Sequence, residues 1–114
     1  MLEIPTSIGY LRSDVSGVRQ SWDEIRLRST AARLGYTLAK TIVFGPYTDD
    51  PVQRLIDVVW SVDAEAVIVP SLDHLGGEVP ATLLAVADTI TVDPQETFSR
   101  WIIPPGPATD TRVR

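Results

Sequence analysis

The chain has 114 residues, of which 44% are apolar and none is cysteine. A single domain of this size can bury its own core, and without thiols it has no disulfide framework, thiolate metal site or cysteine nucleophile. The net charge of −5 argues against binding to DNA and to anionic membranes, and no apolar run approaches the roughly 20 residues that span a bilayer. Because the segment MLEIPTS also lacks the features of a secretory signal, we expect a cytoplasmic protein.

Strand-like and helix-like segments alternate along the chain. β-branched, aromatic or continuous apolar runs indicate the strands, while apolar residues spaced by three, four and seven indicate the helices. The expected elements are a strand at 8–11, a helix from 16 or 17 to 34, a strand at 36–44, a helix from 51, a strand at 64–69, a short helix at 80–87 and a strand at 89–92.

The first long helix has an apolar periodicity that predicts which side faces the core. Charged residues fill the opposite side, and Gly35 follows the last periodic residue, where a glycine commonly ends a helix. In the second long helix, Asp50 and Pro51 are typical of an N-cap followed by proline at the first helical position. The predicted core residues of the first helix are Val18, Trp22, Ile25 and Ala32, with Leu27 and Ala31 beside them.

The alternation of elements predicts an α/β fold of three layers, flavodoxin-like, with a mostly parallel sheet of about four strands and helices on both faces. We expect a single domain at 1–103 and a proline-rich, extended or disordered tail at 104–114. The tryptophans Trp22, Trp60 and Trp101 are either core residues or part of an interface. On the interface interpretation, the protein self-associates.

Ligands of open α/β sheets gather beyond the carboxyl ends of the strands. The first and third strands end in polar residues, which makes this edge the expected functional surface. No Walker-type or dinucleotide-type glycine motif is present. The ligand-binding candidates are Arg12, Ser13, Asp14 and Ser16 after the first strand, and Ser71, Asp73 and His74 after the third.

Three of these candidates have a chemical and a structural interpretation. Ser16 is either a nucleophile or the N-cap of the first helix. Asp73 either orients a reacting partner or caps the third helix, and His74 is either a general base or a plain loop histidine. A single histidine without cysteine argues against a zinc site, and we expect neither a metal nor a cofactor.

The segment GYLRSDVSGVRQSWDEIRLRSTAARLGY resembles the start of the catalytic domain of the serine recombinases, the resolvase/invertase family. That start reads Y-x-R-V-S, followed by a glutamine, a helix and a glycine. The fit requires Ser13 and Asp14 as two inserted residues; without the insertion, Asp14 takes the position of the nucleophilic serine. With it, the matching residues are Tyr10, Arg12, Val15, Ser16 and Gln20.

A second segment, AVIVPSLDHLGGEVP, is similar to the family's apolar strand followed by K-L-D-R-L-G-R. Ser71 replaces the lysine, and His74 and Gly77 replace the two arginines that hold the scissile phosphate in the family. The resemblance covers residues 8–93 and implies a flavodoxin-like sheet in a divergent, inactive member. The matching residues are Leu72, Asp73, Leu75 and Gly76.

Three functions follow as hypotheses. The first is a non-catalytic binding or regulatory module that acts through self-association or a protein partner. The second is a phosphoryl-transfer enzyme with Ser16 as nucleophile and Arg12 as electrophilic partner, supported by Asp73 or His74. It requires Arg12, Ser16 and Asp73 to converge. The third is a sensor of a small molecule or nucleotide, using the cleft at the carboxyl ends of the strands.

Overall fold

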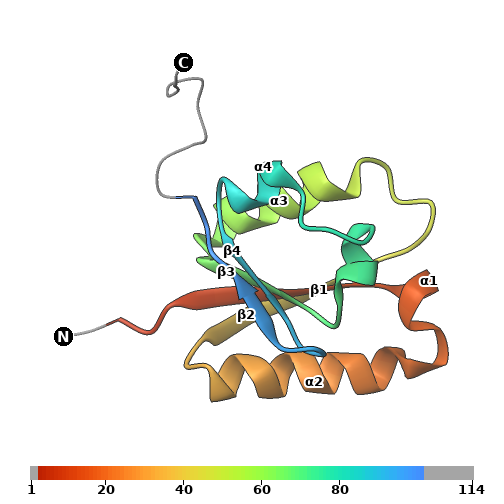
Figure 1. Cartoon of the computed structure of the whole chain (residues 1–114), viewed down its shortest axis with the longest axis horizontal. Coiled ribbons are helices and arrows are strands. Elements are labelled where there is room, and N and C mark those ends of the chain that lie inside the picture. The colour runs from red at the N-terminus through yellow and green to blue at the C-terminus, as the bar shows by residue number, and fades with distance from the viewer. Residues whose placement is uncertain (1–2, 102–114) are drawn as a thin grey trace.

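The computed structural model describes residues 3–101, which form an α/β domain (Figure 1). The strands are β1 (Thr6–Arg12), β2 (Thr37–Phe44), β3 (Ala66–Val69), β4 (Asp88–Thr91) and β5 (Glu96–Phe98). The α-helices are α1 (Ser13–Ser16), α2 (Gln20–Arg33), α3 (Pro51–Val62) and α4 (Ala81–Leu84), and the 3₁₀ segments are η1 (Gly17–Arg19) and η2 (Leu72–Leu75).

The five strands form one sheet in the order β2-β1-β3-β4-β5. The pairs β1–β2, β1–β3 and β3–β4 are parallel, and β5 is antiparallel to β4. The predicted three-layer, mostly parallel α/β fold is therefore confirmed. The expected number of strands was one too low, because the short and largely exposed β5 has no apolar run to indicate it.

Each face of the sheet has its own core. On one face, Ile8 and Val67 pack with Leu55 of α3 and Leu83 of α4. On the other face, the residues of α2 pack on the sheet, and Figure 1 shows this helix on the side opposite α3 and α4. The buried residues of that second core are Leu11, Leu27, Ala31, Ala66, Ile68, Ile90 and Val92. Both faces are covered because right-handed crossovers place successive helices on opposite sides where the strand order reverses.

A glycine lets α2 approach the centre of the sheet. A Cβ atom at Gly9 in β1 would lie 3.1 Å from Cδ1 of Leu27 and 3.2 Å from Oγ1 of Thr41. Leu27 is fully buried, so it has little space into which to move. The absence of a side chain at Gly9 thus sets the depth at which α2 packs.

The predicted core face of the first long helix is wrong. Val18 is fully exposed, and Trp22 and Ile25 are about half exposed, at 54% and 49%. The residues that face the sheet are Asp23, Leu27, Thr30 and Ala31. The helical period was predicted correctly. The wrong side was chosen because the solvent side of the helix carries more apolar residues than the buried side. The end of the helix is as predicted: Gly35 has φ 86°, and the N–H of Tyr36 donates to the carbonyl of Ala31.

The remaining predictions for the helices hold in part. Pro51 is the first residue of α3, but Asp50 adopts a left-handed conformation with φ 48°, and its side chain makes no capping hydrogen bond. The expected helix at 80–87 is a single turn, α4. Trp60 is 68% exposed, and Trp101 is half-buried, with its backbone N–H bonded to the carbonyl of Leu84. Self-association therefore stays a prediction.

Within residues 3–101, no helix is long and apolar enough to cross a membrane. The predicted tail at 104–114, and residues Ile102 and Ile103 before it, lie outside the described residues.

Candidate functional site

A polar pocket lies at the carboxyl edge of the sheet, between the segment that follows β1 and the ends of β3 and β4. Its volume is about 270 Å³. Because β1 and β3 are neighbours whose connections run to opposite faces, this is the position where α/β sheets form a crevice. The lining residues are Val15, Ser16, Arg19, Asp23, Arg26, Pro70, Ser71, Asp73, His74, Val92 and Asp93.

A buried hydrogen bond in the pocket joins Ser16 to Asp23. The Ser16 hydroxyl donates to Oδ2 of Asp23 at 2.6 Å, and both residues are 6% exposed. Short hydrogen bonds to a carboxylate are strong, so this bond fixes α1 against the first turn of α2. Ser16 occupies the N-cap position of η1, as the capping interpretation expected, but its side chain makes no capping hydrogen bond there.

His74 is a structural residue of the pocket wall. It is only 3% exposed, and its Nδ1 accepts a hydrogen bond of 2.9 Å from the backbone N–H of Arg12. Burial lowers the pKa of His74, and the opposing effect of Asp23 and Asp73 is smaller. The imidazole is therefore held neutral with its proton on Nε2. Of the two interpretations His74 has the structural role, but it is not a plain loop residue, because it lies in η2 and its buried ring joins η2 to the end of β1.

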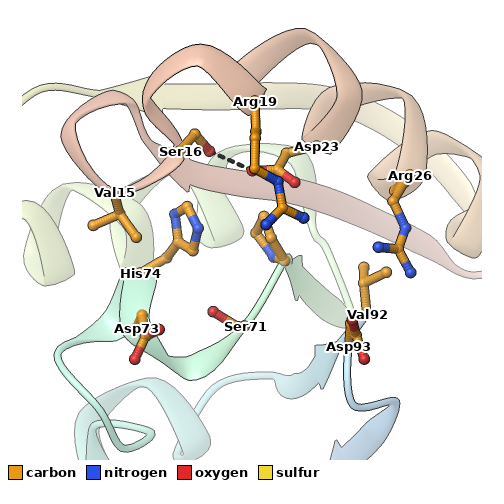
Figure 2. A pocket seen from close by; sticks show the side chains of 11 residues that line it. Val15, Ser16, Arg19, Asp23, Arg26, Ser71, Asp73, His74, Val92 and Asp93 are labelled. Atoms are coloured by element: carbon orange, nitrogen blue, oxygen red, sulfur yellow. Dashed lines mark hydrogen bonds between the residues drawn. The ribbon is translucent and has the colours of Figure 1, made fainter.

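Two arginines supply the positive charge of the pocket. Arg19 ends η1 and Arg26 follows two turns later on α2, so both lie on the same side of the helix. Figure 2 shows both guanidinium groups reaching from the helix toward the side formed by Ser71 and Val92. Neither forms an ion pair with any residue of the described part of the chain.

Carboxylates balance these cations. Asp73 and Asp93 are exposed at the rim of the pocket, and Asp23 is buried in its floor. Asp73 lies within η2 and makes no capping hydrogen bond to α4, whose N-cap is Pro80, so its predicted capping role was wrong. The pocket therefore offers cationic groups for an anion and carboxylate oxygens for hydrogen-bond donors.

The predicted site residues divide into two groups. Ser16, Ser71, Asp73 and His74 line the pocket. Arg12, Ser13 and Asp14 do not, and the Arg12 guanidinium bonds both carboxylate oxygens of Asp14, at 3.1 and 2.9 Å. This ion pair lowers the pKa of Asp14. The convergence of Arg12, Ser16 and Asp73 that the enzyme hypothesis requires is therefore not observed.

Seven lining residues were absent from the predicted site, and three of them are charged residues of one helical segment. Arg19, Asp23 and Arg26 have spacings of four and three, which place them on one side of a helix. That spacing was available from the sequence. The sequence does not show, however, that this side of the helix lines the pocket at the end of the sheet.

Residues 3–101 contain no group of three or more histidine and carboxylate side chains placed to hold a metal ion. Comparison with protein-family models and with curated proteins finds no match to this chain. The resemblance to the serine recombinases therefore rests on the motif residues alone.

Proposed function

We propose that this protein is a non-catalytic binding module whose ligand is a small anionic metabolite that also carries hydroxyl or amino groups. The observation that carries the proposal is the pair Arg19 and Arg26, two cations without carboxylate partners within residues 3–101, facing into one pocket. Guanidinium groups bind phosphate and carboxylate oxygens with paired, charge-assisted hydrogen bonds.

The other lining groups indicate the rest of the ligand. The carboxylates of Asp73 and Asp93 can accept hydrogen bonds, and so can the Asp23 oxygen that is not bonded to Ser16. These carboxylates would repel a ligand that is anionic throughout. Hydroxyl or amino groups placed beside the anionic group satisfy these acceptors. The volume of about 270 Å³ is at the small end of ligand pockets, which favours a sugar phosphate or mononucleotide over a dinucleotide.

The hydrogen bonds at the pocket support binding over catalysis. The Ser16 hydroxyl is bonded to a carboxylate, and carboxylates are weaker bases than imidazole. The only histidine uses Nδ1 to accept a backbone N–H, so this nitrogen has no free lone pair for a proton. In the recombinase resemblance, His74 and Gly77 take the places of two phosphate-binding arginines, which fits an inactive relative.

Isothermal titration calorimetry with ribose 5-phosphate, AMP, inorganic phosphate and ribose tests this proposal. We expect the phosphorylated sugars to bind and ribose to fail. Loss of one charge-assisted contact in Arg19→Gln or Arg26→Gln weakens binding by about 10- to 100-fold. Arg28→Gln is the matched control, because Arg28 is exposed on the same helix and does not line the pocket.

Two results would contradict the proposal. One is the absence of heat and of any rise in melting temperature with every phosphorylated ligand, since a bound ligand stabilises the folded state by mass action. The other is equal weakening in Arg26→Gln and Arg28→Gln, which would show a general charge effect in place of a site. Hydrolysis or transfer of the phosphoryl group would overturn the non-catalytic part.

A further inference from the structure

The outer side of α2 carries an apolar stripe that the fold leaves uncovered. We define the α2 stripe as Trp22, Ile25, Ser29 and Ala32 of α2 together with Val18 of the preceding η1; all of these except Ser29 are apolar. All five are exposed, and Val18 is fully so. Leu27 and Ala31 face the sheet from the opposite side of the helix, and Figure 1 shows α2 as the outermost element of that face. The helix is therefore apolar on two opposite sides, of which the core uses one.

The spacing within the α2 stripe is that of a helix–helix seam. Its members follow one another at intervals of four, three, four and three residues, which is the a/d pattern of a heptad repeat. Within α2 the stripe runs from Trp22 to Ala32, about three turns or 15 Å at 1.5 Å per residue, and Val18 continues it in η1. A seam of two residues in seven suits one partner helix, whereas insertion into a lipid surface requires a broader apolar face.

Arginines flank the stripe on both sides. With Trp22 and Ser29 at heptad position a, the e positions hold Arg26 and Arg33 and one g position holds Arg28. Arg26 points into the pocket, whereas Arg28 and Arg33 are exposed beside the stripe, and Nη2 of Arg33 donates a hydrogen bond to Oε1 of Gln95. These flanking positions form the ion pairs that select a partner in helical seams.

The charge of this helix contrasts with that of the whole chain. Residues 17–34 contain four arginines and the acids Asp23 and Glu24, a net charge of +2, whereas the chain carries −5 and the other residues therefore −7. Two copies that met stripe to stripe would bring arginine against arginine in either orientation, which is unfavourable. An acidic helix meets both requirements, the apolar seam and the opposite charge.

We propose that the α2 stripe is a docking surface for an acidic amphipathic helix of a partner protein. Trp22 is the central anchor, since buried tryptophans contribute a large share of the binding energy at interfaces. Arg28 and Arg33 form ion pairs with glutamate or aspartate on the two sides of the partner helix. The surface is separate from the ligand pocket, so either proposal stands if the other fails.

Fluorescence anisotropy with two synthetic peptides of about three heptads tests the docking proposal. Both have leucine at a and d; one has glutamate at every e and g position and the other has lysine, so that repulsion keeps each monomeric. We expect the full chain to bind the glutamate peptide and not the lysine peptide. Trp22→Ser weakens binding by about 30-fold, the effect typical of a tryptophan anchor. The variant Arg28→Glu/Arg33→Glu reverses the preference between the peptides.

Trp60→Ser is the matched control, because Trp60 is also an exposed tryptophan but lies on α3, across the sheet. All substituted residues are exposed, so circular dichroism should show the same fold for each variant. Equal binding of both peptides, no binding, or equal losses in Trp22→Ser and Trp60→Ser would overturn the proposal. A dimer in sedimentation that dissociates in Trp22→Ser would also overturn the proposal. Tighter binding of the chain to anionic vesicles than to the glutamate peptide would overturn it as well.

Discussion

Adding one methyl group at Gly9 tests how closely α2 is packed on the sheet. In Gly9→Ala, the new Cβ meets Cδ1 of Leu27 at 3.1 Å and Oγ1 of Thr41 at 3.2 Å, both closer than ordinary van der Waals contact. The backbone at Gly9 is not in the left-handed region, so the substitution strains contacts and not φ. Leu27 must move by a few tenths of an ångström within a fully buried core.

The expected cost follows from two opposing effects. Overpacking of a well-packed core costs about 1–3 kcal/mol. Alanine also reduces the conformational entropy of the unfolded chain, which stabilises the folded state by about 0.4–1 kcal/mol. We therefore expect Gly9→Ala to lower the free energy of unfolding by about 0–2.6 kcal/mol, and a domain of this size loses about 4–8 °C in Tm for each kcal/mol.

Gly45→Ala supplies the control. There a Cβ would meet only Oγ of Ser13 at 3.7 Å, an ordinary contact, so we expect stabilisation by about 0.4–1 kcal/mol. Chemical denaturation of both variants, and of Gly9→Ala in a Leu27→Ala background, measures the effect. Removing Cδ1 of Leu27 should reduce the cost of the alanine by about 1 kcal/mol. If Gly9→Ala were as stable as Gly45→Ala, or its cost were independent of Leu27, the reasoning would be refuted.

Three further predictions concern buried polar groups. Ser16→Ala removes the donor to Asp23 and should lower the free energy of unfolding by about 1.5–3 kcal/mol in urea titrations; a change below about 0.5 kcal/mol would show the bond to be unimportant. Because burial lowers the pKa of folded His74, protons bind the unfolded chain first, so stability should fall as pH drops below about 6.5. His74→Asn keeps an acceptor for the N–H of Arg12 and should remove this loss of stability at low pH. If the variant lost stability with pH as the original protein does, His74 would be excluded as the source. Thr89→Val should leave stability unchanged or raise it by about 1–2 kcal/mol, since the buried Thr89 hydroxyl has no hydrogen-bond partner among residues 3–101; clear destabilisation would contradict this.

The sequence by itself determined the order of the elements and the edge of the sheet where polar residues gather. Strands such as Ala66–Val69 are continuous apolar runs because both of their faces are buried, and this pattern needs no tertiary information to be read. Ser16, Ser71, Asp73 and His74 were placed at the pocket for the same reason, since parallel strands end at the same edge.

Tertiary structure alone decided which side of α2 is buried and which charged groups face the pocket. The periodicity of an amphipathic helix does not tell two apolar sides apart, and Asp23 occupies the inner side because Ser16 supplies its hydrogen bond. Arg12 was expected after the first strand but is the last residue of β1, and its guanidinium pairs with Asp14 and does not line the pocket, whereas Arg19 and Arg26 do. Side-chain direction at a strand end depends on partners brought together by folding, so local sequence patterns do not determine it.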